Sequence, residues 1–526
     1  MTNDHSFPEK LSDSQPFGFP DASKAPDYEA LKRSVKFESL DVNVKMSVIF
    51  GKKGAGKTLY IQTQHEHWSR RRDVFVAGYE STPPSHRLVK TFFSMFDSVN
   101  SCDSAWKDLW LKVIYRTVYC HLIFHPTLNK QIDKRFKSDE FYNKYRKILP
   151  PNRTAHSMFK QLAITLDQLN SSKTQFESFV DSPLWADFEE DLTEMLKFSK
   201  PIYFFLDQFD NEFELAPYAW LSCQYGLFLA IFELDRLKFK NQIHIIAGLR
   251  EIVYTYLLNS AHGSKFLYDN RVMVLHWNAR LAEEFLRNKL EMLPNRFFID
   301  PNSPKSISNF FGDSAIPVSR NKVTMDEQVV HYILRHTMLQ PRDIINIGNV
   351  FCDKLRFMAD NSQPEERLRI LKDAVSTIAH QTARDQLRIA SLLITNSWIY
   401  SGPNGDEVTE IIEDASVLQG IEQNLKSLIS HLKFDKFSRA KLLSCLNQLD
   451  KFGLSTESDP VKALYLSGLL GYIERKQDGK DRIRYFSESR ATQWTIPQQV
   501  KNYVFHSSLI DFLQILPKNT PTFEYA

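Results

Sequence analysis

The sequence contains few cysteines and no long apolar run. Its 526 residues include five cysteines, which are scattered and never form a Cys-x-x-Cys pair. This argues against a zinc site and makes a reducing cytoplasm the expected location. No apolar stretch approaches the roughly 20 residues that span a bilayer, and no signal peptide is recognised. A formal net charge of +3 is too small to indicate nucleic-acid binding by itself.

Several catalytic signatures are also missing. No segment resembles a nuclease, a protease, an NADase or a pore. His121 and His125 have the i, i+4 spacing of a helical metal site, but no glutamate follows the first histidine, and core packing is the expected role. No Asn/Thr-Lys-x-Asp guanine-reading motif is present, which favours ATP over GTP as a ligand. The length allows two to four domains of ordinary soluble composition.

The most informative stretch that is present reads VIFGKKGAGKTLY and matches the P-loop pattern. An apolar run precedes it and a helical pattern follows it, as strand–loop–helix geometry requires. Glycines allow the backbone N–H groups to converge on phosphate oxygens, and the following helix adds the positive end of its dipole. The predicted nucleotide-binding residues are Gly51, Lys52, Lys53, Gly54, Ala55, Gly56, Lys57, Thr58 and Leu59, with Lys57 on the terminal phosphates and Thr58 on Mg²⁺.

A second apolar run, IYFFL, ends at Asp207 and indicates a Walker B strand. We expect this strand beside the P-loop strand, with the Asp207 carboxylate reaching Mg²⁺ directly or through water. The alternative role for Asp207 is a helix cap.

Further apolar strands end at Arg250 and at Leu275. Strands that alternate with helices predict a parallel sheet with helices on both faces, whose carboxyl-terminal edge would bring together the loop, Asp207 and Arg250. Arg250 would contact the terminal phosphate as a sensor, or would be an ordinary arginine at a strand end.

The expected architecture is an α/β P-loop NTPase core, an α-helical lid and a C-terminal unit similar to a winged helix. Residues 1–35 form an extended or disordered segment, with Phe17 and Phe19 as candidate anchors. The nucleotide-binding domain covers 36–293 and contains a helical insertion over about 83–200. Residues 294–432 form the lid and linker helices, with 294–324 irregular, and 433–526 form the C-terminal unit. Arg342, near the start of a lid helix, would reach toward the phosphates or pair on the surface.

The C-terminal unit has two predicted helices, the second over 460–470, followed by two strands around Asp478-Gly479, a tight hairpin signal. The hairpin is basic, with Arg482 and Arg484 in its second strand, so a phosphate contact with DNA is possible. Winged helices also pack against protein, and one basic hairpin does not decide between the two roles.

These motifs resemble a bacterial P-loop ATPase family of the AAA+/STAND (origin-recognition-like) group, whose members often sit beside antiviral or mobile-element genes. The resemblance covers about residues 15–360 and, more loosely, the C-terminal unit. Beyond the P-loop, Asp207 and Arg250, it is carried by PFGFPDASKAPDYE, LHWNARLAEEFLRNKL and LQPRDIINIGN. It implies that Lys57 and Thr58 bind phosphate and Mg²⁺, that Asp207 holds the metal, and that Arg250 and Arg342 act as sensors.

One position departs from that group. A glutamate commonly follows the Walker B aspartate, whereas here the residue is Gln208. A glutamine can orient water but cannot accept its proton as a carboxylate does. Asp210 or Glu212 would be the substitute, Asp210 completing an Asp-x-x-Asp pattern with Asp207. We therefore expect slow turnover.

Three functions follow as hypotheses. The first is an ATP-binding switch ATPase that controls a partner or effector, with antiviral defence as a further step resting on the resemblance. The second is a nucleotide-bound DNA regulator or loader without appreciable hydrolysis. The third is a scaffold subunit whose effector is supplied by a partner. A homo-oligomer is possible, with Arg271 as a candidate finger for a neighbouring subunit or a member of a salt bridge.

Overall fold

The computed structural model describes residues 15–20, 47–96, 99–149, 156–209, 213–234, 241–259, 269–320, 323–357, 363–395, 415–454, 459–475, 481–486 and 499–515, with a few single positions between them. Most of the predicted N-terminal segment 1–35 lies outside the described residues. Within these ranges, no helix combines the length and apolar character needed to cross a membrane.

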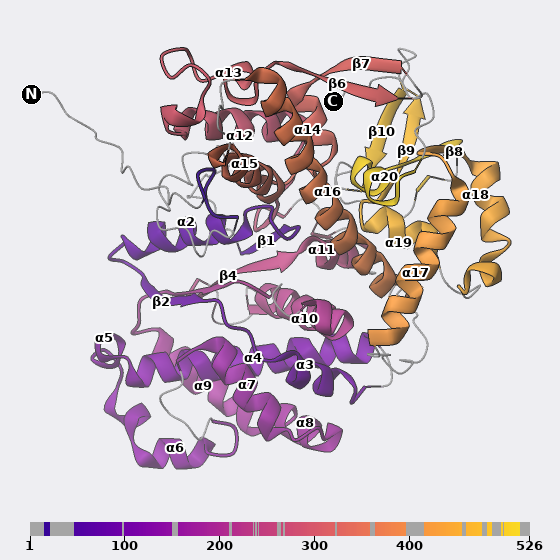
Figure 1. Cartoon of the computed structure of the whole chain (residues 1–526). Helices are drawn as coiled ribbons and strands as arrows, with labels where there is room; N and C mark the ends of the chain where they lie inside the picture. The colour runs from indigo at the N-terminus through magenta and orange to yellow at the C-terminus, as the bar shows by residue number, and fades with distance from the viewer. Residues whose placement is uncertain are drawn as a thin grey trace, which may run out of the picture.

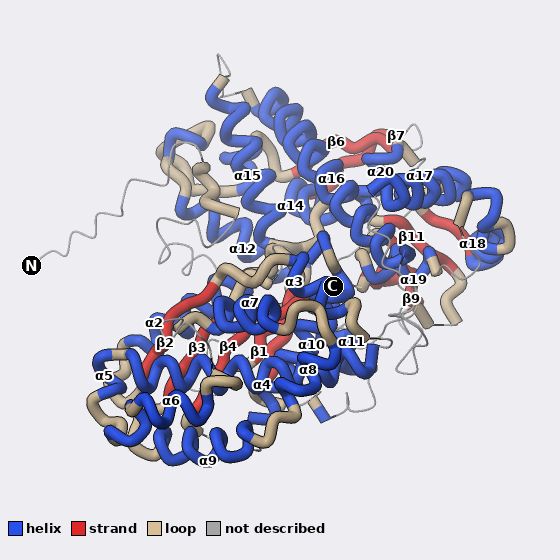
Figure 2. The backbone as a smooth tube through the Cα atoms, turned by 90° about the horizontal axis from the view of Figure 1, so that it is seen from below, coloured by secondary structure: helices blue, strands red, loops and turns tan. Residues whose placement is uncertain are grey.

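The chain contains a five-stranded parallel sheet, of which Figure 2 shows β2, β3, β4 and β1 side by side. Its order is β2-β3-β4-β1-β5, which confirms the predicted parallel sheet with flanking helices. The prediction that the strand ending at Asp207 lies beside the P-loop strand is wrong, because β4 pairs with both and separates them. Apolar runs of similar composition identify buried strands but do not encode their neighbours. The strands are β1 Val48–Gly51, β2 Phe75–Glu80, β3 Ile202–Leu206, β4 Ile243–Arg250 and β5 Val272–Val274.

The two faces of the sheet are covered by different helices, because alternate side chains of each strand point to opposite faces. Ile49, Phe205 and Ile246 pack with α2 (Lys57–Ser69) on one face. Phe50, Phe204 and Ile245 pack on the other face, with α10 (Pro217–Leu234) and the helical insertion. Helix α11 (Glu251–Asn259) follows β4 directly. Figure 1 shows α2 and α10 on opposite sides of the sheet.

The predicted helical insertion is confirmed between β2 and β3. Its longest helix, α4, packs closely on α10, since a Cβ at Gly226 would lie 2.3 Å from the Cβ of Trp106. The Glu80 carboxylate at the end of β2 accepts hydrogen bonds from the backbone N–H groups of Met158 and Phe159, which ties α7 to the sheet. The helices are α3 His86–Phe93, α4 Val99–Phe124, α5 Pro126–Asn129, α6 Asp139–Tyr145, α7 Met158–Gln168, α8 Lys173–Val180 and α9 Leu184–Leu196.

The lid region is helical as predicted, but it also contains a hairpin that begins in the segment expected to be irregular, 294–324, and extends beyond it. Strands β6 (Ala315–Arg320) and β7 (Val323–Gln328) pair antiparallel. Their apolar alternation covers only Ile316 and Val318 in one strand and Val323 and Met325 in the other, and Pro317 interrupts the first, so the strand signal is weak. The lid helices are α12 Ala279–Met292, α13 Ile307–Phe311, α14 Val329–Arg335, α15 Pro341–Arg356 and α16 Pro364–Thr395.

The C-terminal unit combines helices with a four-stranded antiparallel sheet, ordered β10-β9-β11-β8. The predicted hairpin is confirmed as β9 and β10, while its turn lies outside the described residues. The helix predicted to reach Leu470 ends at Leu466, because Gly468 turns the chain with φ +79° and β9 begins at Leu470. The elements are α17 Ala415–Leu432, β8 Lys436–Ser438, α18 Arg439–Leu446, α19 Pro460–Leu466, β9 Leu470–Arg475, β10 Asp481–Tyr485, β11 Asn502–Phe505 and α20 Ser507–Leu513.

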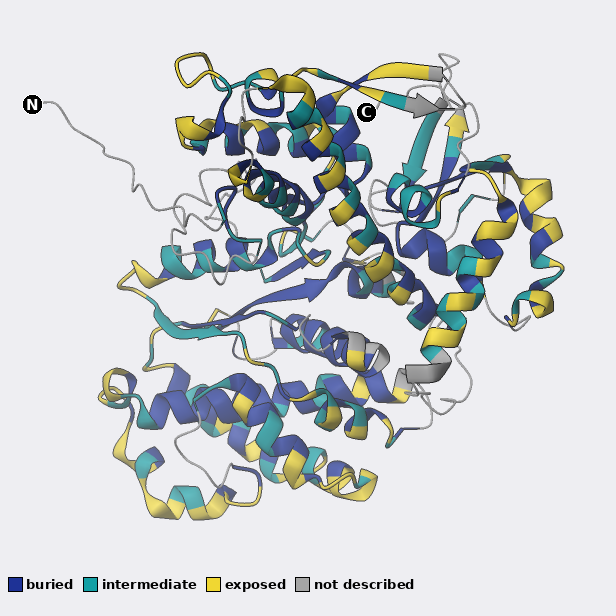
Figure 3. Ribbon diagram, in the orientation of Figure 1, coloured by how far each residue is buried: buried dark blue, intermediate teal, exposed yellow. Residues whose placement is uncertain are grey.

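Helix α16 connects the lid to the C-terminal unit. It has 32 residues, and its first half contributes Leu371 and Val375 to the lid core. Its second half contributes Leu387 and Ala390 to a separate core shared with α17 and the C-terminal sheet. Figure 3 shows the helix as alternating buried and exposed stripes between these two parts.

Candidate functional site

The loop between β1 and α2 turns at two glycines. Gly54 and Gly56 have φ values of +94° and +99°, in the left-handed region that residues with a Cβ rarely adopt. Among the described residues, no acceptor receives a hydrogen bond from either backbone N–H group. The loop therefore presents two amides, together with the N-terminus of α2, as donors for an anion.

Lys57 is the first residue of α2 and is only 6% exposed. Its Nζ donates hydrogen bonds to the carbonyl oxygens of Gly51 (2.9 Å) and Lys52 (3.1 Å), which holds the ammonium against the loop. Ala55 and Leu59 are buried. The Ala55 carbonyl accepts a hydrogen bond from the Trp277 indole at 2.9 Å. Leu59 packs in the lid core, so the loop is fixed from both sides.

Asp207, at the end of β3, is 1% exposed and faces the start of α2. Its Oδ2 accepts a hydrogen bond from the Tyr79 hydroxyl at 2.6 Å, and the Thr58 hydroxyl also bonds to the carboxylate. Burial raises the pKa of Asp207, while the bonds from Tyr79 and Thr58 and the charge of Lys57 act against that rise. The structure thus brings together two residues predicted to share a metal ion, Thr58 and Asp207.

Gly248 makes this meeting possible, because β4 lies between the strands that carry Asp207 and the loop. A Cβ at Gly248 would lie 3.0 Å from Oδ1 of Asp207 and 2.6 Å from Cδ1 of Ile61 on α2. The missing side chain leaves the space through which the carboxylate reaches α2. A glycine inside an apolar strand is the signal for such a close approach.

The residues after Asp207 are only partly positioned. Gln208 has φ +62°, a left-handed conformation that costs an ordinary residue roughly 1–2 kcal/mol. Phe209 is fully buried, with its ring 4.9 Å from that of Phe159, so the chain turns sharply at Gln208. Asp210 and Glu212, the proposed substitutes for the missing glutamate, lie outside the described residues.

Arg250 ends β4 directly beside Gly51, its partner in the sheet register. It is 8% exposed, and its guanidinium lies 4.6 Å from the centre of the Phe213 ring. With Lys52, Lys53 and Arg342, it lines a cavity of about 330 Å³ that extends from the loop to the C-terminal unit. Three carboxylates, those of Glu251, Asp343 and Asp385, line the same cavity, so its four cations exceed its acidic side chains by one.

Glu251 lines the same cavity and was not identified from the sequence. It is 4% exposed; burial raises its pKa, and the charges of Lys52 and Lys57 act in the opposite direction. In the sequence, the feature that could have identified Glu251 as a site residue is its position directly after the strand that ends at Arg250.

The start of α15, in the lid, packs directly against the loop. A Cβ at Gly54 would lie 2.9 Å from the Cβ of Arg342 and 2.9 Å from Oε1 of Gln340. The structure therefore places the start of the Arg342 side chain beside the loop. The next residue, Asp343, is buried, and burial raises its pKa to about 6.

The described part of the N-terminal segment packs on the lid. Phe17 is 1% exposed and its backbone N–H donates to Oδ1 of Asn349 at 2.9 Å. Gly348 provides the space, since a Cβ there would lie 2.2 Å from the Phe17 ring. The Pro20 carbonyl accepts a hydrogen bond from Nε of Arg342 at 3.4 Å. Phe17 is the anchor of this segment, while Phe19 is not among the buried residues.

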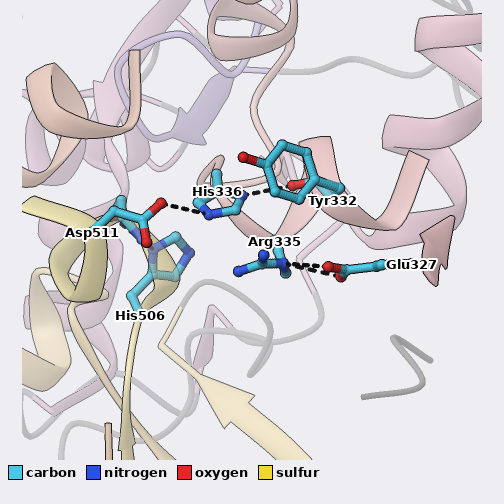
Figure 4. Close-up of polar contacts among 7 residues, drawn as sticks. Glu327, Tyr332, Arg335, His336, His506 and Asp511 are labelled. Carbon is cyan, nitrogen blue, oxygen red and sulfur yellow. Dashed lines mark hydrogen bonds and ion pairs between the residues drawn. The ribbon is translucent and has the colours of Figure 1, made fainter. Parts of the chain in front are cut away.

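The C-terminal unit is bonded to the lid by two histidines (Figure 4). His336 lies between the Tyr332 carbonyl, 2.7 Å from Nδ1, and the Asp511 carboxylate, 2.8 Å from Nε2. His506 caps α20 through Nδ1, and its Nε2 lies 3.2 Å from the Thr337 carbonyl. Both imidazoles are buried, so these bonds hold α20 against the end of α14.

The C-terminal unit also reaches the loop itself. The Lys52 ammonium lies 5.5 Å from the centre of the Phe486 ring and 3.7 Å from the position of a Cβ at Gly468. Leu466 and Phe486 line the cavity beside the loop. Lys52 of the β1–α2 loop therefore contacts the unit farthest away in the sequence.

The basic hairpin is partly neutralised. Arg484 pairs with Glu474 across the hairpin at 3.1 Å, and Glu474 is also the register partner of Arg482.

Arg271, the candidate finger for a neighbouring subunit, forms a salt bridge with Asp269, which is the alternative role given for it above.

The predicted residues Gly51–Thr58, Asp207, Arg250 and Arg342 gather at one edge of the sheet, whereas Asp210 has no described position. Tyr79 and Glu251 were missed because hydroxyl and carboxyl groups at strand ends have no fixed spacing from the P-loop. The described residues contain no group of three or more His, Cys, Asp or Glu side chains that could hold a metal ion.

Comparison with protein-family models gives no match for the chain, and comparison with curated protein sequences gives none either.

The space at Gly248 generates a testable prediction. Gly248→Ala should destabilise the protein by about 1–3 kcal/mol, because the new Cβ overpacks against Ile61 and Asp207. Adding Ile61→Val should recover part of the loss, since that change removes the atom 2.6 Å away. Thermal unfolding of both single variants and the double variant gives the coupling. If the stability loss of the double variant equals the sum of the two single-variant losses, Gly248 and Ile61 do not approach each other as described.

A second prediction concerns pH. Burial, together with the nearby charge of His336, lowers the pKa of His506 to about 3. Because this value is below the unfolded value of 6.5, the contribution of His506 to stability is complete above pH 6.5 and is lost as the pH falls toward 3.

His506→Gln should therefore weaken the closure of α20 by about 1–2 kcal/mol at pH 7.5. At pH 5.5 the difference from the unaltered protein should shrink by about 1.4 kcal/mol, because only the unaltered protein must keep the imidazole neutral. Hydrogen exchange of the Ser507–Leu513 amides, compared between the two proteins at each pH, measures this. A difference that does not change with pH would contradict the prediction.

Proposed function

We propose that this protein is an ATP-binding switch of the P-loop class, which hydrolyses ATP slowly to ADP and phosphate and thereby controls a protein partner. The observation that carries the proposal is the bond between Thr58 and Asp207 beside the loop. A hydroxyl at a helix N-terminus, a carboxylate from another strand, a buried lysine and two unbonded glycine amides are the groups that a Mg²⁺–nucleotide requires.

The residues present fit such a ligand. Thr58 and Asp207 would hold Mg²⁺, and the lack of a larger acidic cluster among the described residues suits an ion that keeps water and phosphate ligands. The bound nucleotide would supply the reactive phosphoryl group. Lys57 and the amides of Gly54 and Gly56 would hold its phosphates, and Arg250 and Arg342 would neutralise charge on the outer phosphate.

The switch part of the proposal is supported by the contacts of the loop. Gly54 touches the lid at Arg342, and Lys52 touches the C-terminal unit at Phe486. A phosphate bound by the loop would compete for these cations and alter both contacts. A ligand shifts the balance between two conformations only if its contacts differ between those conformations. In the proposed switch, the contacts that differ are those of Arg342 and Lys52.

Slow turnover is part of the proposal because Gln208 follows Asp207 and no described carboxylate replaces the usual glutamate at that position. The resemblance to the AAA+/STAND group supports the class. A role in antiviral defence rests on that resemblance. A cytoplasmic setting is supported by the five cysteines, which are all free and buried.

Two observations favour protein packing over DNA reading by the C-terminal unit, if it is a winged helix. Its second helix, α19, packs on α16, and most of its side chains are buried, so it is not available to enter a groove. The hairpin arginine Arg484 is paired with Glu474. The partner is accordingly proposed to be a protein, or a second copy of this chain.

The first test is nucleotide binding. Lys57→Ala should weaken ATP affinity at least about tenfold, because a charged hydrogen-bond partner worth roughly 1.5–3 kcal/mol is lost. Thr58→Ala should remove the Mg²⁺ dependence of binding, and Thr58→Ser, which keeps the hydroxyl, should preserve it. Calorimetric titration with ATP, with and without Mg²⁺, measures both effects. ATP binding that is absent, or identical in Lys57→Ala, would refute the proposal.

The second test is turnover. Gln208→Glu should raise the rate of ATP hydrolysis by about tenfold or more, since a carboxylate can accept the proton of the attacking water and general-base catalysis typically contributes more than that. Phosphate release at saturating ATP is the measurement, with Gln208→Asn as the control that adds no base. Equal rates of phosphate release for Gln208→Glu and Gln208→Asn would show that the missing carboxylate at this position is not the cause of slow turnover.

A further inference from the structure

The helical insertion has a hollow of its own, on the side of the sheet away from the lid. Its lining residues come mainly from α6, α7 and α8, which Figure 1 shows below the sheet, and its volume is about 580 Å³. Two exposed cations, Arg146 and Lys147, stand at its edge, and among the described residues no carboxylate lines it. Neither cation forms an ion pair with a described residue.

A third cation is buried behind the wall of this hollow. Arg116 on α4 is 1% exposed, and its Nη2 donates to Oε1 of Gln168 at 3.0 Å. Its guanidinium lies 5.5 Å from the centre of the Phe179 ring. Gln168 and Phe179 both line the hollow, so the guanidinium lies directly behind its surface.

The charge of Arg116 is not compensated within the described structure. Its remaining bond goes to the neutral hydroxyl of Thr165, and its Nε is buried without a hydrogen-bond partner. Buried arginines are normally paired, because an unpaired buried charge costs several kcal/mol. The positive potential of three cations without a counter-ion is directed at the hollow.

The remaining lining has the character of a small-molecule site. Asn143, Gln168 and Gln175 offer amide groups, and Tyr142 and Phe179 offer aromatic surface. The volume lies in the range of about 300–1,000 Å³ typical of small-ligand sites.

We propose that this hollow binds a small anionic ligand, whose phosphate or carboxylate group is held by Arg146 and Lys147 in the field of Arg116. The site lies on the helical insertion and does not depend on nucleotide binding by the P-loop. The amides and aromatic rings would contact the uncharged part of the ligand.

The test uses the full chain carrying Lys57→Ala, so that the P-loop contributes little. Sodium phosphate, AMP and citrate are each titrated calorimetrically at constant ionic strength. We expect saturable binding of at least one probe with a Kd in the millimolar range or tighter, weakened at least about tenfold by Arg146→Gln/Lys147→Gln. The matched control Lys130→Gln/Lys134→Gln, which changes two exposed cations of the same insertion outside the hollow, should bind as before.

A further variant separates binding from structure. Gln168→Glu would place a carboxylate against Arg116, which should raise the thermal unfolding temperature. The same change should weaken probe binding, because the new carboxylate already neutralises the charge of Arg116. Binding of phosphate and AMP without citrate would identify a phosphate ligand, and the reverse a carboxylate ligand. The proposal is overturned if no probe binds saturably, if both double variants bind alike, or if Gln168→Glu leaves the affinity unchanged.

Discussion

The hydrogen bond between Thr58 and Asp207 is the interaction on which the arrangement of the site depends. It joins the first turn of α2 to a strand that does not neighbour β1, and it exists because Gly248 has no side chain to fill the space between them. The buried carboxylate costs free energy, which Tyr79, Thr58 and Lys57 together offset. Loop, helix and sheet edge are therefore held in one geometry before any ligand arrives.

Three distant parts of the chain converge on this loop. The lid touches it at Gly54, the C-terminal unit touches it at Lys52, and the N-terminal segment reaches it through the bond from Arg342 to Pro20. Packed interfaces of this kind respond to small local shifts by changing between discrete arrangements rather than deforming smoothly. This convergence is the observation on which the proposed coupling between the loop, the lid and the C-terminal unit rests.

The sequence predicted the strands of the sheet, the helical insertion and the residues that meet at its edge, because buried strands and the P-loop have strong local patterns. It did not predict the place of β4 between β1 and β3, the β6–β7 hairpin or the role of Tyr79. Strand neighbours depend on side-chain packing between distant segments, and the apolar alternation of VTMDEQ covers only Val323 and Met325. Arg116 was missed because an unpaired charge can be recognised only when all its neighbours are known.

Helix α16 gives the arrangement a mechanical property. Its 32 residues span about 48 Å, and one half is built into the lid core while the other is built into the C-terminal core. A continuous helix anchored in both cores transmits a tilt of the lid to the C-terminal unit. A tilt of only about 5° at the lid would carry its far end through about 4 Å, most of one helical turn. A displacement no larger than a phosphate group could thus become a movement large enough to uncover a protein surface.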